Sequence, residues 1–142
     1  LGRLLPQTEL VVVTTPQLSA QKVATRVADM AKRSFIPLLG VVENMSYFES
    51  GDGNKYNIFG KGGGDELSEK FGIPLLSKIP ISEDSIEESE NGKPILLQNN
   101  KTPTKEAMQN LVNTIIKILP PVSDETCTGR LAKVLEELEV EA

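Results

Sequence analysis

The sequence predicts an α/β fold: the C-terminal half of a doubly wound, mostly parallel sheet with flanking helices, plus a small hairpin excursion. Three short runs of aliphatic and β-branched residues have the length of buried strands, namely residues 9–15, 36–42 and 74–80. Segments with helical spacing separate these runs. Strand–helix–strand units with short connections imply parallel strands covered by helices.

The first strand, helix and second strand form one βαβ unit. Residues 9–15 read ELVVVTT, a β-branched run that Pro16 closes. Over residues 17–33, apolar residues recur at intervals of three and four, which predicts an amphipathic helix. Its inward stripe contains Leu18, Val23, Val27, Met30 and Ala31, with Ala20, Ala24 and Ala28 between them. Residues 36–42 (IPLLGVV) are a second apolar strand, followed by the polar ENMS.

The segment 47–59 interrupts this alternation. Its two arms, YFES and KYNIF, are separated by the turn-forming sequence GDGN, which predicts a hairpin. The glycine-rich residues 60–64 then lead into a helix at about residues 65–71, which a Gly-Ile-Pro sequence ends. Residues 74–80 (PLLSKIP) are the third buried strand.

The rest of the chain is predicted to be mainly helical. Ser82 is an N-cap candidate because acidic residues follow it in the first turn. Residues 104–119 form an amphipathic helix, and leucines spaced through an acidic C-terminal segment indicate one more short helix. We therefore expect a partial α/β domain over residues 1–119, followed by a linker and a short acidic helix over residues 120–142.

Composition excludes several classes of function. The formal net charge of −5 argues against non-specific binding to nucleic acid or to an anionic membrane. The longest apolar run near the start, LVVVTTP, is too short to span a bilayer. Because the chain has no histidine and one cysteine, Cys127, imidazole catalysis and an internal disulfide are excluded. A single cysteine without a signal peptide is typical of a cytoplasmic protein.

The glycine-rich sequence GKGGG does not fit a phosphate-binding loop. A Walker A loop requires a lysine after its glycines and then serine or threonine, whereas Lys61 precedes most of the glycines and Gly62 follows it. A dinucleotide-binding loop would need a small residue where Asp65 stands. We therefore favour a hinge and helix start over phosphate binding. No catalytic or metal-binding residues are predicted.

The sequence ENMS indicates a binding site. It places Asn44 just past the end of a parallel strand, where open α/β sheets bind ligands. The asparagine amide carries a donor and an acceptor and can therefore read an adenine edge. Pro80 and Ile81 lie at the corresponding end of the next strand and could form an apolar wall for the base. The alternative is that Asn44 only caps its own loop.

Several of these segments together resemble one family. LPQT running into VVVTTPQ, then PLLGVVENMSYF, NIFGKGGGDELSEKFGIPLLSKIPI and NGKPI, closely resemble the Mrp/NBP35 (ApbC-type) iron–sulfur cluster carriers over residues 1–97. These are P-loop ATPases of the deviant Walker A class, related to MinD and nitrogenase iron protein. The resemblance implies ATP with magnesium and a homodimer in the intact protein, with iron–sulfur clients or scaffolds as partners. It implies that Asn44 contacts adenine, that Pro80 packs on the base, and that Thr14 and Thr15 lie near the phosphates.

The chain departs from the family pattern at two places. The family's P-loop and Walker B aspartate lie upstream of LLPQTEL, so we expect this chain alone not to hydrolyse ATP. Glu49 and Asp52 stand where the family's C-x-x-C is expected, and carboxylates do not replace thiolates as cluster ligands. The expected function is the adenine-side pocket and dimer-contact hairpin of an ATP-binding cluster carrier. The alternative is a non-catalytic, MinD-like interaction module without nucleotide or cluster.

Overall fold

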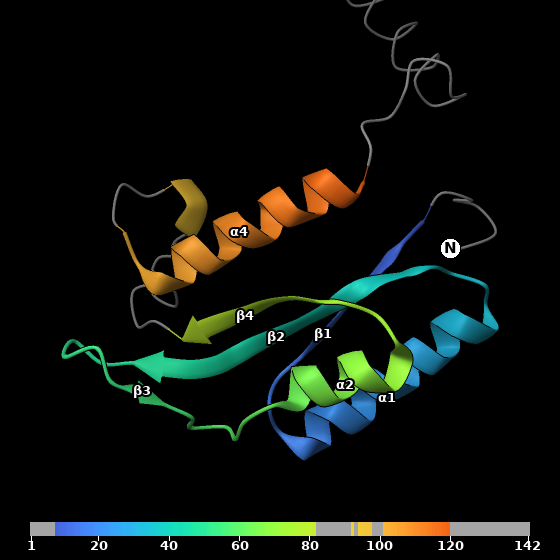
Figure 1. The fold of residues 1–142 in the computed structure, drawn as a ribbon, viewed down its shortest axis with the longest axis horizontal. Coiled ribbons are helices and arrows are strands. Elements are labelled where there is room, and N and C mark those ends of the chain that lie inside the picture. The colour runs from blue at the N-terminus through green and yellow to red at the C-terminus, as the bar shows by residue number, and fades with distance from the viewer. Residues whose placement is uncertain (1–7, 82–91, 93, 98–100, 120–142) are drawn as a thin grey trace, which may run out of the picture. The chain divides into compact units, whose positions relative to one another are not determined.

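The computed structural model describes residues 8–81, 92, 94–97 and 101–119, and the chain divides into two compact units, Leu1–Leu111 and Val112–Ala142. The elements are β1 (Leu10–Thr14), α1 (Leu18–Arg33), β2 (Leu38–Glu49), β3 (Lys55–Tyr56), α2 (Gly63–Phe71), β4 (Leu75–Ile81), the short 3-10 helix η1 (Ile95–Leu97) and α4 (Pro103–Ile118), as Figure 1 shows. The predicted helix that begins at Ser82 and the predicted segments within residues 120–142 lie outside the described residues.

The sheet is mostly parallel, with β2 at its centre. Strands β1 and β4 both pair with β2 in parallel, and the short β3 pairs with the far end of β2 in the antiparallel direction. Helices α1 and α2 lie together on one face of this sheet (Figure 1). The predicted class is therefore confirmed. None of the helices in the described part of the chain is long and apolar enough to cross a membrane.

The core forms where α1 and α2 pack on the sheet. Its buried cluster consists of Val12 and Val41 from the strands, Ala24 and Ala28 from α1, and Leu67 and Phe71 from α2. Small residues on α1 let the helix approach the sheet closely, so Ala24, Ala28 and Ala31 of the predicted stripe are buried, and Ala20 is half-buried. The larger members of the stripe are not, since Leu18 is 64% exposed and Val23 is 61% exposed. The prediction of one continuous inward stripe was wrong for these larger residues.

Strand β2 is longer than the sequence indicated. The prediction ended it at Val42 and treated ENMS as a loop, but β2 continues through this sequence to Glu49. The hairpin explains the extension, because Phe48 pairs with Tyr56 and Glu49 pairs with Lys55 in the antiparallel register. The predicted hairpin is thus confirmed, and its first arm is a continuation of the central strand.

Helix α4 confirms the helix predicted over residues 104–119. Its first turn is linked to β4 through Thr104, whose buried hydroxyl donates a hydrogen bond to the Pro80 carbonyl at 3.1 Å. Farther along, the Ser77 hydroxyl donates to the Ala107 carbonyl at 3.3 Å. These two bonds connect the end of the sheet to the beginning of the helix.

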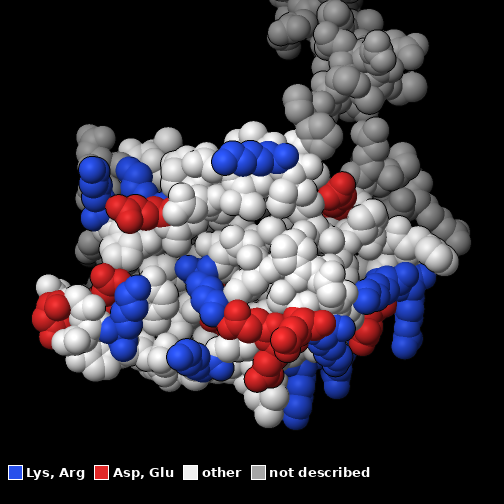
Figure 2. All heavy atoms as spheres, in the orientation of Figure 1, with Lys and Arg blue, Asp and Glu red and all other residues white. Residues whose placement is uncertain are grey.

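The charged side chains on the face seen in Figure 2 are of mixed sign. Lysine and arginine side chains alternate there with aspartate and glutamate, and no single large basic patch forms on this face. One such pair is Lys78 and Asp65, whose charged atoms lie 2.7 Å apart between β4 and the beginning of α2.

Candidate functional site

The carboxyl ends of the three parallel strands meet at one edge of the sheet. There Thr14 of β1 is opposite Glu43 of β2, and Asn44 of β2 is opposite Ile79 of β4. Pro80 and Ile81 follow Ile79 as the last two residues of β4. The register therefore brings the three predicted site residues onto neighbouring strands, at the edge where sheets of this type bind ligands.

A bulge in β2 displaces the backbone directly after Asn44. The register between β2 and β4 is interrupted between Asn44 and Phe48, and Met45 has a left-handed φ of 53°. Bulges of this kind re-aim side chains and are frequent next to functional sites. The Asn44 Oδ1 atom accepts a hydrogen bond from the Met45 N–H at 2.9 Å, so the asparagine does cap its own bulge.

The position of Asn44 differs from the prediction. It was expected just past the end of a strand, but it lies within β2, because the strand resumes beyond the bulge. The side chain is half-buried rather than enclosed. Pro80 is buried, and Thr104 donates to its carbonyl, whereas Ile81 is half-buried. Contacts of these three residues with a nucleotide remain predictions.

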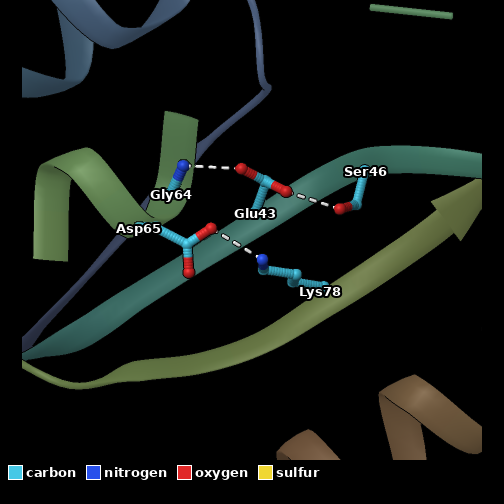
Figure 3. A network of polar contacts seen from close by, with 5 residues as sticks. All are labelled: Glu43, Ser46, Gly64, Asp65 and Lys78. Atoms are coloured by element: carbon cyan, nitrogen blue, oxygen red, sulfur yellow. Dashed lines mark hydrogen bonds and ion pairs between the residues drawn. The ribbon is translucent and has the colours of Figure 1, made fainter. Parts of the chain in front are cut away.

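A buried carboxylate lies immediately before the bulge (Figure 3). Glu43 is 1% exposed, and its two carboxylate oxygens accept hydrogen bonds from two different elements. The Ser46 hydroxyl, within the bulge, donates to Oε1 at 2.5 Å. The Gly64 N–H, in the first turn of α2, donates to Oε2 at 2.6 Å. Through these two hydrogen bonds the Glu43 side chain ties the bulge to the first turn of α2.

The consecutive glycines allow this close approach. A Cβ atom on Gly64 would lie 2.8 Å from the Glu43 Cβ and 3.0 Å from a methyl group of Leu75. A Cβ on Gly63 would lie 2.9 Å from the Cα of Pro16, the residue that closes the turn after β1. The glycines therefore serve packing, and the anion at the beginning of α2 is the chain's own Glu43. This geometry supports a helix start rather than a phosphate-binding loop.

A pocket of about 380 Å³ lies beside Asn44, between β1 and α1. Its lining is mainly apolar, with Asn44 and two threonines as the polar groups: Val11, Val12, Val13, Thr14, Thr15, Ala20, Val23, Ala24, Val27 and Asn44. The buried Thr15 hydroxyl has no hydrogen-bond partner within the described part of the chain. Most buried hydroxyls are paired, so this one marks a place where a further group could bind.

The hairpin tip is built from hydrogen bonds between polar side chains and the turn backbone. Asp52 accepts from the Ser50 hydroxyl, from the Asn54 N–H at 3.2 Å and from the Asn54 amide at 2.6 Å. The bond from Ser50, followed by those from Asn54, holds the pKa of Asp52 below its ordinary value of 3.8. Glu49 instead lies 3.7 Å from the Lys55 ammonium group. The described residues contain no cluster of histidine, cysteine or acidic side chains that could hold a metal ion, and Cys127 lies outside them.

Sequence reasoning identified Asn44 but missed its neighbours Glu43 and Ser46. A signal was present, because Glu43 is a charged residue directly after a continuously apolar strand. Fully buried glutamates are rare unless they are paired. One partner of the Glu43 carboxylate is the N–H group of Gly64, in the glycine-rich loop. Nothing in the sequence alone indicates that this N–H group faces the carboxylate.

Comparison with known proteins identifies the family to which this chain belongs. Residues 1–116 match the ParA family model described as NUBPL iron-transfer P-loop NTPase. The chain therefore belongs to this family of iron-transfer P-loop NTPases. The resemblance inferred from VTTPQ, ENMS and IFGKGGG is confirmed.

Individual relatives agree with the family. The iron–sulfur cluster carrier protein of Mycobacterium leprae is 34% identical over 118 residues, which cover 79% of this chain and 31% of the relative. A nucleotide-binding protein of Archaeoglobus fulgidus in complex with ADP is 37% identical, with a TM-score of 0.51 over 58% of this chain and 35% of that chain. The cell division ATPase MinD of Pyrococcus furiosus shares the fold, with a TM-score of 0.59 at 21% identity over 78% of this chain and 43% of that chain. The chain spans about a third of the length of the curated relatives it matches.

Proposed function

We propose that this chain forms the adenine side of an ATP site in a larger iron–sulfur cluster carrier protein, with Asn44 as the residue that reads the base. The observation that carries the proposal is that Asn44, directly before the bulge in β2, lines the pocket beside β1 in a chain of a P-loop NTPase family. The ADP complex of the A. fulgidus relative supports a nucleotide as the ligand.

The chemistry of Asn44 suits an adenine edge. Its Oδ1 atom accepts the Met45 N–H, which fixes the plane of the amide, and a carbonyl oxygen has a second lone pair to accept from an exocyclic amine. The Nδ2 group can donate to a ring nitrogen of the base. The half-buried Ile81, two residues beyond the register partner of Asn44, supplies an apolar neighbour for a ring.

The free side of β1 supports the presence of another part of the nucleotide-binding domain. Within the described residues β1 is an edge strand. Val13 of β1 is 59% exposed, and Val23 of α1 is 61% exposed. Apolar side chains along an unpaired edge of a parallel sheet normally have a covering layer. We propose that the phosphate-binding half of the domain packs here, with magnesium and the phosphates on the side of Thr15.

The hairpin at residues 47–59 is proposed as a contact in a homodimer. It exposes two large apolar side chains, with Tyr56 51% exposed and Ile58 60% exposed. Because Glu49 and Asp52 replace the family's thiolates, any cluster that the protein carries would need ligands from elsewhere. Iron–sulfur client or scaffold proteins are the proposed partners.

The test is the ATP affinity of the complete protein after Asn44→Ala. Without the Asn44 amide the adenine edge is left unpaired, which should weaken ATP binding by about 1–3 kcal/mol, or roughly 5–150-fold in Kd. Asn113→Ala is the matched control, because Asn113 is an exposed asparagine of α4 outside the proposed site and should leave Kd unchanged. Equal ATP affinity in wild type and Asn44→Ala would remove Asn44 from the site. A complete protein that binds no nucleotide would favour the MinD-like interaction module.

A further inference from the structure

We infer that Glu43 is a positioning residue. It holds the β2 bulge that orients the Asn44 side chain, and it couples that bulge to the glycine-rich loop at residues 60–64. The inference rests on the proposed function of Asn44 in base recognition. It concerns Glu43 rather than Asn44, and it assigns Glu43 a role in nucleotide binding in addition to its role in packing. Three features of the structure lead to it.

The first feature is the bridging geometry of the carboxylate (Figure 3). Oε1 accepts from Ser46, which lies within the bulge, and Oε2 accepts from Gly64, in the first turn of α2. Glu43 directly precedes Asn44, so its side chain is anchored at two points one residue away from the proposed base contact. With Glu43 only 1% exposed, water does not compete for either oxygen.

The second feature is the strained backbone that this bridge encloses. Met45, between Glu43 and Ser46, has a φ of 53°, a conformation that residues with a side chain rarely adopt. Such strain persists only where neighbouring contacts hold it. Without the Glu43–Ser46 bond, β2 could regain regular pleating, and a change of one residue in a strand turns the side chains to the opposite face. The Asn44 side chain would then point away from the proposed base contact.

The third feature is the connection to the loop. Gly64 follows Gly63, which packs against Pro16 at the end of the turn after β1, next to Thr15 of the pocket. The Glu43 side chain thus links the glycine-rich loop, on the side of the pocket, to the bulge next to Asn44. A shift of the loop should therefore move Asn44, and a shift of Asn44 should move the loop.

The experiment is a double-mutant cycle on the complete protein, with Kd measured for ATP and for GTP. The variants are Glu43→Ala, Asn44→Ala and the double variant, with Glu43→Gln as the conservative change. Glutamine can still accept from Gly64 through its oxygen and donate to the Ser46 hydroxyl through its amide. Lys78→Met is the matched control, because Lys78 holds the adjacent residue of α2, Asp65, from the exposed side. Thermal unfolding without nucleotide is recorded for each.

We expect Glu43→Ala to weaken ATP binding at least fivefold and to reduce the preference for ATP over GTP to about the level of Asn44→Ala. In the Asn44→Ala background it should have no further effect on that preference. Glu43→Gln should restore most of the preference, and Lys78→Met should leave it unchanged. A residue that served stability alone would lower the unfolding temperature and leave the preference for ATP intact.

Each result distinguishes this inference from the function on which it rests. If Asn44→Ala lowers the preference for ATP and Glu43→Ala does not, the inference is wrong and the base contact stands. Additive effects of the two changes would also overturn it. If Asn44→Ala leaves the preference unchanged, the base contact itself is wrong, and the inference fails with it. Should Glu43→Ala not fold, Ser46→Ala in its place removes one of the two bonds and completes the cycle.

Discussion

Replacement of Gly64 by alanine tests the packing between α2 and the sheet. The added methyl group would lie 2.8 Å from the Glu43 Cβ, closer than such carbons approach, and 3.0 Å from a Leu75 methyl group, which would have to shift. The Glu43 contact is a Cβ held by the backbone of the central strand and cannot rotate away. The strain must therefore be relieved by moving the first turn of α2 away from β2.

The expected destabilisation is the balance of three effects. Overpacking a well-filled site destabilises by about 1–3 kcal/mol. Alanine is favoured over glycine in a helix by up to about 1 kcal/mol, which offsets part of this. If the turn moves far enough to break the 2.6 Å bond from the Gly64 N–H to the buried carboxylate, about 1.5–3 kcal/mol is added. With the bond broken, these effects combine to a net loss of about 1.5–6 kcal/mol in the free energy of unfolding.

The assay is denaturant unfolding of the complete protein, with Gly51→Ala as the matched control. Gly51 lies in the hairpin turn, and a Cβ there would meet nothing within 4 Å. That variant should fall within about 0.5 kcal/mol of wild type, as surface changes usually do. If Gly64→Ala were as stable as the control, the close contact with Glu43 would not be a determinant of the fold, and the structural role assigned to the consecutive glycines would be wrong.

Two further changes test other parts of the structure. Thr104→Val should destabilise by about 1–3 kcal/mol in denaturant unfolding, because it leaves the Pro80 carbonyl without its buried partner, whereas Thr104→Ser keeps the hydroxyl and should recover most of the loss. In Ser50→Ala the pKa of Asp52 should rise toward its ordinary value, since the bond from Ser50 is the largest cause of its depression, and an NMR titration of the carboxyl group would measure this. Because the folded-state pKa is lowered, the stabilisation of the turn is present above the ordinary value of 3.8 and is lost as the pH falls through the folded-state pKa. An unchanged titration in Ser50→Ala would contradict the assigned cause.

Most of the fold could be predicted because the strands and helices have strong local signals. The aliphatic runs at β1 and β4 and the spacing in α4 indicated their elements to within a few residues. The end of β2 could not be predicted in this way, since ENMS contains residues typical of loops. Its continuation depends on pairing with β3 across the hairpin and with Ile81, which is distant in sequence. The inward face of α1 was misjudged for a related reason: only the distance to the sheet shows that alanines, rather than valines, face it.

The candidate site was predicted through single residues, while its geometry depends on contacts between segments. Asn44, Pro80 and Ile81 were chosen from their positions after strands, and the register does bring their strands together. The bulge, the buried carboxylate and the burial of Pro80 under Thr104 were not foreseen. Each requires knowledge of which distant group satisfies a buried polar atom, and hydrophobic periodicity carries no information about that.

The beginning of α2 also explains why a glycine-rich sequence in a nucleotide-binding family need not bind phosphate. A phosphate loop works because several N–H groups at a helix start are left for the ligand. In this chain the Gly64 N–H is already donated to the Glu43 side chain. A phosphate brought to the same turn would compete with Glu43 for that N–H group and would meet the nearby carboxyl group of Asp65. The glycines are therefore required for the close approach of α2 to β2.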